Sequence, residues 1–284
     1  QLAADKHFVA ATNGMYFSLS YGAPVYPFIA HGRPIVLSTH PMKVAGVGVN
    51  RRAEEANAWL AGSVRSDAAV MALAALNLTP PQGLSAFTSV WGSGRVPLPS
   101  DARTRQVSHG RIATATGHYR KVPKGGALLV ARGHVAKRWL RALAKHAPVT
   151  IHRHVETDAP VRFQDAFGVG TRTVAHADQT STHLYCARSE ALAARTSIAW
   201  SRSRSTLLLV TAESPHGPDH YGLDENQMSA LLVHLRAAGG YALDGGTSTE
   251  MIARTGSHDR LVLEAAPHGH GQRAIPVGVG ITYR

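Results

Sequence analysis

The alternation of apolar and polar residues predicts that much of this chain folds into short β-strands. Residues 43–50 alternate as a half-buried strand does, and the apolar run over residues 206–211 predicts a buried strand. Residues 8–37 combine short strands with Pro-rich turns. Further strands are expected in residues 106–115, 127–131, 149–155, 260–265 and 275–283.

Two segments show the spacing of an amphipathic helix. The apolar stripe of the first consists of Val135, Trp139, Leu140 and Leu143. In the second, Asp224 is expected to cap the N-terminus together with Gln227, three residues further on. Its apolar stripe consists of Met228, Leu231, Leu232 and Leu235, and Gly239-Gly240 is expected to end the helix.

Two regions are less regular. Residues 53–78 fit a helix or a buried strand equally well, and residues 156–194 show little periodicity, which predicts a long functional loop or an insertion. The mixture of many short strands with few helices predicts an α+β fold with strand-rich mixed sheets and two or three packed helices. A single domain over residues 1–284 is expected.

Net charge narrows the classes of partner. The chain has a formal charge of +12, which should attract nucleic acid, anionic wall polymers or phosphorylated glycans. The basic residues are dispersed and no RNA-binding aromatic motif is present, so we expect no dedicated nucleic-acid site. The longest apolar stretch, Ala68 to Leu76, is far shorter than the roughly 20 residues of a transmembrane helix.

The sequence contains no strong motif for binding a metal or a cofactor. Cys186 is the only cysteine, which excludes disulfides within the chain and cysteine-based zinc sites. The pairs His152/His154 and His268/His270 have a chelating spacing but no carboxylate at a fixed offset. The chain contains neither a Gly-x-Ser-x-Gly elbow nor a phosphate-binding P-loop. We therefore expect no metal and no cofactor.

The stretch from Tyr241 to Met251 is the clearest site candidate. A short apolar run ends at Asp244, and Gly245-Gly246 with Thr247-Ser248 follow directly. A strand that stops there would expose the carboxylate at a sheet edge, and the turn's N–H groups and hydroxyls could bind an anion such as phosphate. An ordinary strand-to-turn junction is the alternative, just as Asn13-Gly14 alone predicts a hairpin turn.

Several segments together resemble the phosphodiester glycosidase family. Its Asn-Gly-Gly-Phe-Phe element is similar to residues 13–17, and its Arg-Thr-Ala-Ile-Gly element is similar to residues 195–199. Its helix and following Asn-Leu-Asp-Gly-Gly-Gly-Ser-Ser element are similar to residues 224–238 and 242–248. The closing strand after an Arg is similar to residues 273–280. The resemblance covers nearly the whole chain in order, although family members usually have further strands upstream.

The resemblance implies hydrolysis of a sugar 1-phosphodiester at the anomeric carbon. It makes Asp244 the nucleophile or general base, and Glu250 a second carboxylate. Arg195 would hold the phosphate together with the turn Gly245-Gly246-Thr247-Ser248. Asn13, followed by Gly14, and Thr196 would orient sugar or phosphate oxygens. The substrate would be a glycosyl phosphodiester or another anionic glycan.

Departures from the family pattern keep two alternatives open. Met15, Ala199, Ala242 and Thr247 stand where the family has other residues, mostly glycine, and Thr247 restricts the turn. A secreted, non-catalytic binder of anionic glycans or cell-wall polymers is the first alternative, and a phosphodiesterase that cleaves the P–O bond is the second. The chain begins at Gln1, so we expect an upstream signal to have been removed from a secreted or cell-envelope protein.

Overall fold

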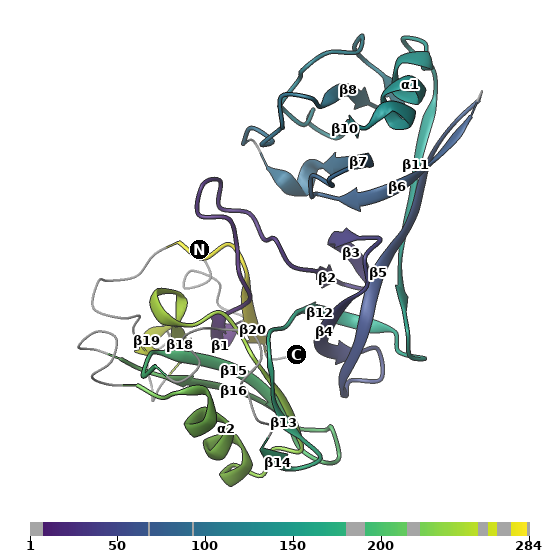
Figure 1. The fold of residues 1–284 in the computed structure, drawn as a ribbon. Helices are drawn as coiled ribbons and strands as arrows, with labels where there is room; N and C mark the ends of the chain where they lie inside the picture. Colours follow the sequence, from purple (N-terminus) through teal and green to yellow (C-terminus); the bar gives the residue numbers. More distant parts are fainter. Residues whose placement is uncertain are drawn as a thin grey trace. The chain divides into compact units, whose positions relative to one another are not determined.

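The computed structural model describes residues 8–67, 69–92, 94–179, 191–214, 222–254, 261–265 and 274–282. Cys186, His268, His270 and Arg273 lie outside these residues. The chain forms two compact units (Figure 1). Unit 1 comprises Gln1–Phe17, Asn50–Glu54 and Val169–Arg284, and unit 2 comprises Ser18–Val49 and Glu55–Gly168. The assignment of residues 1–284 to a single domain stays a prediction.

Unit 2 is built on a mixed sheet of eleven strands in the order β11-β5-β4-β12-β2-β3-β6-β7-β10-β8-β9. Strands β6 and β7 pair in parallel, whereas β10 pairs antiparallel with both β7 and β8. The bounds are β2 (Phe28–Ala30), β3 (Arg33–Ser38), β4 (Met42–Gly48), β5 (Ala53–Ser66), β6 (Val70–Leu76), β7 (Gly83–Thr88), β8 (Arg103–Ser108), β9 (Arg111–Ile112), β10 (Ala127–Arg132), β11 (Val149–Thr157) and β12 (Phe163–Gly168).

The core of unit 2 lies on both faces of β10. Leu129 packs with Leu84 and Leu140 on one face, while Leu128 and Val130 pack with Phe87 on the other. Helix α1 (His134–Ala142) covers the first face and packs against β7, β8 and β10. A short 3-10 helix, η2 (Ser89–Trp91), follows β7. Burial on both faces explains why the sequence of β10 is continuously apolar.

Unit 1 contains two antiparallel sheets. One has the order β19-β18-β1-β20 and the other the order β14-β13-β17-β15-β16. Helix α2 (Glu225–His234) packs on β13, β14 and β15. A 3-10 turn, η3 (Gly246–Ser248), follows β17. The bounds are β1 (Phe8–Asn13), β13 (Arg172–Ala175), β14 (Asp178–Gln179), β15 (Arg195–Trp200), β16 (Leu207–Ala212), β17 (Gly239–Ala242), β18 (Met251–Ala253), β19 (Val262–Ala265) and β20 (Gly278–Thr282).

The predicted fold class is confirmed: the protein is α+β and strand-rich, with two α-helices among the residues described. The undecided region 53–78 forms two strands, β5 and β6. The prediction of a loop or insertion over residues 156–194 is wrong for its described part, because β12, β13 and β14 lie there. These strands are short, and β12 ends in three consecutive buried residues, so they show no alternation.

Smaller differences concern element ends and faces. Val135 is 71% exposed although it was assigned to the apolar stripe of α1. Gly239-Gly240 begins β17 instead of ending α2, because Arg236 takes the left-handed conformation with φ 62°. Strand β16 is half-buried throughout and lies at a sheet edge. Residues 106–115 contain a turn that separates β8 from β9.

No helix among the residues described is long and apolar enough to span a membrane.

Candidate active site

The side-chain amide of Asn13 joins the end of β1 to two other segments of unit 1. Its Nδ2 donates to the carbonyl oxygens of Asp244 at 2.7 Å and Gly14 at 3.1 Å. Its Oδ1 accepts from the Thr196 hydroxyl at 2.7 Å and from the Glu250 N–H at 3.2 Å. An amide has two N–H donors, so both are used within the protein. Asn13 is 2% exposed, and this geometry favours a positioning role over direct contact with a substrate.

The Asn13-Gly14 pair is therefore not a hairpin turn. Strand β1 pairs with β18 and β20, which come from the other end of the chain. Gly14 is required by close packing, because a Cβ at this position would lie 2.6 Å from Val277 Cγ1. Its N–H donates to the Val277 carbonyl at 2.8 Å, which fastens the residue beside β20.

Asp244 lies just beyond the end of β17, and only 7% of its surface is exposed. Its Oδ2 accepts a hydrogen bond from the Ser248 hydroxyl at 2.6 Å. The backbone N–H of Asp244 donates to the Gly14 carbonyl at 3.2 Å, and that of Leu243 donates to the Thr196 carbonyl at 2.8 Å. The end of β1, the start of β15 and the turn after β17 thus hold this buried carboxylate in place.

The glycines of the turn fit its conformation. Gly246 has φ 60°, which a residue with a side chain adopts only with strain. A Cβ at Gly245 would lie 3.0 Å from the Ala194 carbonyl oxygen, to which Gly246 donates its N–H at 2.8 Å. The N–H groups of Ser248 and Thr249 also bond to carbonyls of the turn. These three N–H groups are engaged within the protein, which differs from the expected phosphate-binding concavity.

Arg195 begins β15 beside the same turn. Its Cδ would lie 3.9 Å from a Cβ at Gly245. The guanidinium donates to the carbonyl oxygens of Leu223 at 3.0 Å and Ala191 at 2.8 Å. Its Nη1 lies 3.6 Å from Oε1 of Glu225. The guanidinium thus connects the segment before β15 to the start of α2.

Glu225 is a candidate residue that the sequence analysis did not single out. It is the first residue of α2 and is 8% exposed. Burial raises its pKa, Arg195 acts to lower it, and the charge of Asp224 adds to the rise. Its Oε2 is buried and meets no hydrogen-bond donor in the part of the chain described. In the sequence Glu225 is an ordinary acidic residue in the first turn of a helix. Only its burial in the structure identifies it as a candidate.

The remaining candidates divide into two groups. Thr196 and Glu250 meet at Asn13: the Thr196 side chain donates to its Oδ1, and the Glu250 carbonyl accepts from the Asn13 N–H at 3.3 Å. Thr196 is buried and Glu250 is half-buried. Thr247, in contrast, is exposed at the tip of η3. The structure therefore gathers Asn13, Gly14, Thr196, Glu250 and the Asp244 turn at one end of the two sheets.

Comparisons with solved structures agree with this fold. A hypothetical protein from Synechocystis shares 16% identity over 98% of this chain and 52% of its own, with a TM-score of 0.73. A Burkholderia pseudomallei protein described as exported shares 16% identity over 95% of this chain and 65% of its own, with a TM-score of 0.70. The chain thus spans less than two thirds of each. At these identities the likeness shows the fold alone.

A third structure is the catalytic domain of zebrafish N-acetylglucosamine-1-phosphodiester alpha-N-acetylglucosaminidase, auto-inhibited by its pro-peptide. It shares 11% identity over 96% of this chain and 95% of its own, and its TM-score of 0.37 is too low to support an argument. No curated protein matches the chain. The family described as phosphodiester glycosidase matches residues 104–282, which is more than half of the sequence. The chain therefore belongs to the phosphodiester glycosidase family.

Proposed function

We propose that this protein hydrolyses a sugar 1-phosphodiester at the anomeric carbon and that Asp244 carries the reaction. Family membership supports the reaction class. The observation that carries the choice of residue is the buried Asp244 carboxylate, held by Ser248 in a turn that Asn13 and Gly14 fasten to β1. A carboxylate fixed in this way is preorganised for attack or for proton abstraction.

The chemistry fits a site with one well-positioned carboxylate. Cleavage of the anomeric C–O bond passes through an oxocarbenium-like state, and a phosphate monoester leaves. The second pKa of a phosphate monoester is about 6, so this group departs without strong protonation. Asp244 acts as nucleophile or general base, and the hydroxyl of Ser248 fixes the orientation of its carboxylate. The departing phosphate binds beside the turn through the exposed Thr247 hydroxyl, because the N–H groups of Gly246, Ser248 and Thr249 are already engaged.

Arg195 acts mainly as a positioning residue in this proposal. Two of its N–H groups already donate to carbonyl oxygens, and the group also pairs with Glu225. Its positive charge still lies close to the Asp244 turn and favours the negative charge that develops on a departing phosphate. This role replaces direct clamping of the phosphate.

A second carboxylate comes from Glu225 or Glu250. Glu225 suits the weak general acid that such a departing group can still use, because burial raises its pKa and a carboxyl with a raised pKa keeps its proton closer to neutrality. Glu250 is tied through its backbone to Asn13, which keeps it near the Asp244 turn. The variants Glu225→Gln and Glu250→Gln distinguish them. The activity of the wild-type protein should fall at alkaline pH as the general acid loses its proton, and this fall should be absent when that acid is replaced.

The charge of +12 supports one other function, the binding of anionic glycans without turnover. Cleavage of the P–O bond is the other outcome to test. Hydrolysis in ¹⁸O-labelled water separates these possibilities. Label in the sugar supports the proposal, label in the phosphate indicates a phosphodiesterase, and binding without products indicates a binder.

The assignment of Asp244 is tested by Asp244→Asn on a glycosyl phosphodiester. We expect turnover to fall by roughly a thousandfold or more, as when a group that acts in the transition state is removed. The matched control is Asp178→Asn, which changes an exposed carboxylate of the same unit and should keep wild-type activity. Turnover within a few-fold of wild type in Asp244→Asn would show that another residue carries the reaction.

We further propose that the protein acts in a secreted form or at the cell envelope. A relative of the same fold is described as exported, and an anionic wall glycan would be encountered there. Cell fractionation with an antibody against the protein tests this location, and recovery only in the cytoplasm would contradict it.

A further inference from the structure

Unit 2 contains a basic cavity that the proposed reaction does not use. It has a volume of about 390 Å³, which lies within the range of roughly 300–1,000 Å³ typical of small-ligand pockets. Three parts of unit 2 line it: the segment after η2, strand β8, and the loop between β9 and β10. In chain order the lining residues are Arg95, Gln106, His118, Tyr119, Arg120 and Lys121. We propose that this cavity, called here the basic pocket, binds a phosphate group of an anionic glycan.

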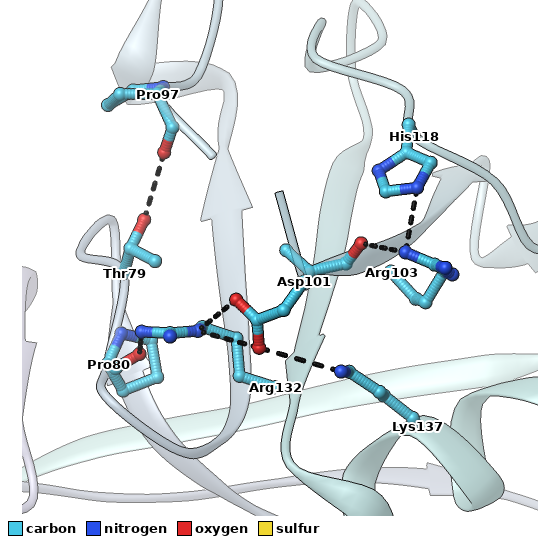
Figure 2. Close-up of polar contacts among 9 residues, drawn as sticks. Thr79, Pro80, Pro97, Asp101, Arg103, His118, Arg132 and Lys137 are labelled. Atoms are coloured by element: carbon cyan, nitrogen blue, oxygen red, sulfur yellow. Dashed lines mark hydrogen bonds and ion pairs between the residues drawn. The ribbon is translucent and has the colours of Figure 1, made fainter. Parts of the chain in front are cut away.

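Charge is the first argument for an anionic ligand. Arg95, Arg120 and Lys121 line the basic pocket and are exposed, and none of its lining residues is acidic. Asp101 precedes β8, and its carboxylate is already used: it lies 3.1 Å from Arg132 Nε and 3.5 Å from Lys137 Nζ (Figure 2). The positive charge of the pocket is thus not neutralised by Asp101.

The second argument concerns the hydrogen-bonding state of His118. Figure 2 shows Arg103 directed at this histidine, with Arg103 Nη1 lying 2.7 Å from His118 Nε2. A guanidinium can only donate, so Nε2 accepts and the ring proton lies on Nδ1. In this tautomer His118 carries its N–H on Nδ1, and the ring lines the basic pocket beside the arginine and lysine side chains.

The backbone around the basic pocket is fixed in advance. The N–H of Val96 donates to the Arg120 carbonyl at 2.7 Å, and Gln106 Nε2 donates to the Lys121 carbonyl at 2.9 Å. Arg105 is buried beneath the loop and donates from Nε to the Thr116 hydroxyl at 2.8 Å. These bonds hold the loop through contacts within the protein alone, so binding does not have to order it.

An aromatic residue of the lining suits a ligand with a ring system attached to its phosphate. Tyr119 lines the basic pocket and is 36% exposed. Aromatic side chains combine an apolar face with polar edges, which is suited to a sugar ring. The inference that the ligand is a glycan and not a nucleic acid rests on the proposed function. The inference that the pocket binds a phosphate group rests on the charge of its lining alone.

Equilibrium binding on the full chain tests the inference without relying on turnover. The Asp244→Asn variant serves as background so that the ligand is not consumed. Calorimetric titration at low salt uses a sugar-phosphate polymer, with a neutral dextran and a single-stranded oligonucleotide as comparison ligands. We expect the double variant Arg95→Gln/Lys121→Gln to bind the sugar-phosphate polymer at least tenfold more weakly than the background protein.

The matched control is Arg138→Gln/Lys145→Gln, which removes the same charge from exposed positions of unit 2 outside the pocket. Binding within about twofold of the background protein is expected for it. Equal losses in both double variants would indicate a diffuse charge effect and overturn the pocket. Tighter binding of the oligonucleotide through the same residues would overturn the choice of a glycan. Because binding is measured without catalysis, a failed pocket leaves the turnover and ¹⁸O results of the proposed function unaffected.

Discussion

The side-chain Nδ2 of Asn13 donates a hydrogen bond of 2.7 Å to the backbone carbonyl of Asp244, 231 residues further along the chain. This bond fixes the backbone of the candidate nucleophile itself, just beyond the end of β17. The side-chain oxygen of Asn13 also accepts a hydrogen bond from the hydroxyl of Thr196. The end of β1, the start of β15 and the turn after β17 therefore meet at one buried side chain. Asn13 thus holds these three segments together at the candidate site.

Asn13→Asp is expected to destabilise the protein although it hardly changes the shape of the side chain. A carboxylate cannot donate to the carbonyls of Asp244 and Gly14, and its charge would be buried. We expect a loss of at least about 3 kcal/mol in the free energy of unfolding, because unpaired buried charges cost more than neutral groups. Urea unfolding followed by circular dichroism measures this loss.

Thr196→Val provides the graded comparison for Asn13→Asp. It removes one donor to Asn13 Oδ1 and keeps the N–H of Glu250 as another. The expected loss is about 1 kcal/mol. Losses of equal size in the two variants would contradict the assignment of Asn13 as the central residue.

Gly246→Ala should reduce activity through the backbone of the Asp244 turn. The residue has φ 60°, and no neighbouring atom lies within 4 Å of an added Cβ, so conformational strain is the main effect. A cost of about 1–2 kcal/mol is expected. Strain relieved by a shift of the turn would displace Asp244 and lower turnover roughly a hundredfold, as for misplacement by about 1 Å.

Gly125→Ala is the matched control for Gly246→Ala. Gly125 has φ 66°, its Cβ would also meet no atom within 4 Å, and it lies in unit 2. We expect a similar loss of stability with wild-type turnover. A parallel loss of turnover in both variants would mean that stability, and not the position of Asp244, limits activity.

The parts of the fold that the sequence predicted well are those with local signals. The capping box of α2 is one, since Asp224 accepts from the Gln227 N–H and the Gln227 side chain accepts from the Asp224 N–H. The short strands β12 to β14 lack such a signal. Gly239-Gly240 was predicted to end α2 but begins β17, because Arg236, and not a glycine, takes the left-handed conformation after α2.

The candidate site was less predictable than the fold because its contacts are long-range. The glycines and hydroxyl residues after Asp244 made the turn predictable from the sequence. The hydrogen bond between the Asp244 carbonyl and Asn13 depends instead on sheet topology. The engagement of the turn's N–H groups by Ala194 and by its own carbonyls is also a tertiary property. Burial of Glu225 follows from the packing of α2, which a first-turn acidic residue does not reveal.

Glu225→Gln should change how stability depends on pH. The pKa of Glu225 is raised above 4.5, the ordinary value, chiefly by burial. The folded state therefore binds this proton more tightly than the unfolded state, and its contribution to stability is present below 4.5 and lost as pH rises through the folded pKa. Gln cannot ionise, so this decline should be absent from the variant.

Denaturant unfolding at intervals from acidic to neutral pH measures the effect of Glu225→Gln. Glu264→Gln, at an exposed position in the same unit, should retain the wild-type pH dependence and serves as control. An identical pH dependence in wild type and Glu225→Gln would contradict the raised pKa.

Ser248→Ala tests whether the hydroxyl that contacts Asp244 Oδ2 orients the carboxylate. A hydrogen bond to a charged group is worth about 1.5–3 kcal/mol, which corresponds to roughly a tenfold to hundredfold loss if it is needed in the transition state. We expect kcat to fall by this factor while KM changes little, because the carboxylate remains present but less well oriented. Steady-state kinetics on the glycosyl phosphodiester that the wild-type protein hydrolyses gives both parameters.

Ser197→Ala is the control for Ser248→Ala because it removes a second buried hydroxyl from unit 1. Ser197 is 1% exposed, and its Oγ has no hydrogen-bond partner among the residues that the structure describes. Its removal should leave kcat unchanged and should not lower the free energy of unfolding, since a buried hydroxyl without a partner is itself unfavourable. If Ser248→Ala behaves like Ser197→Ala in both kcat and stability, the hydroxyl of Ser248 does not orient Asp244. If only Ser248→Ala loses activity, the 2.6 Å contact is part of the reaction's machinery.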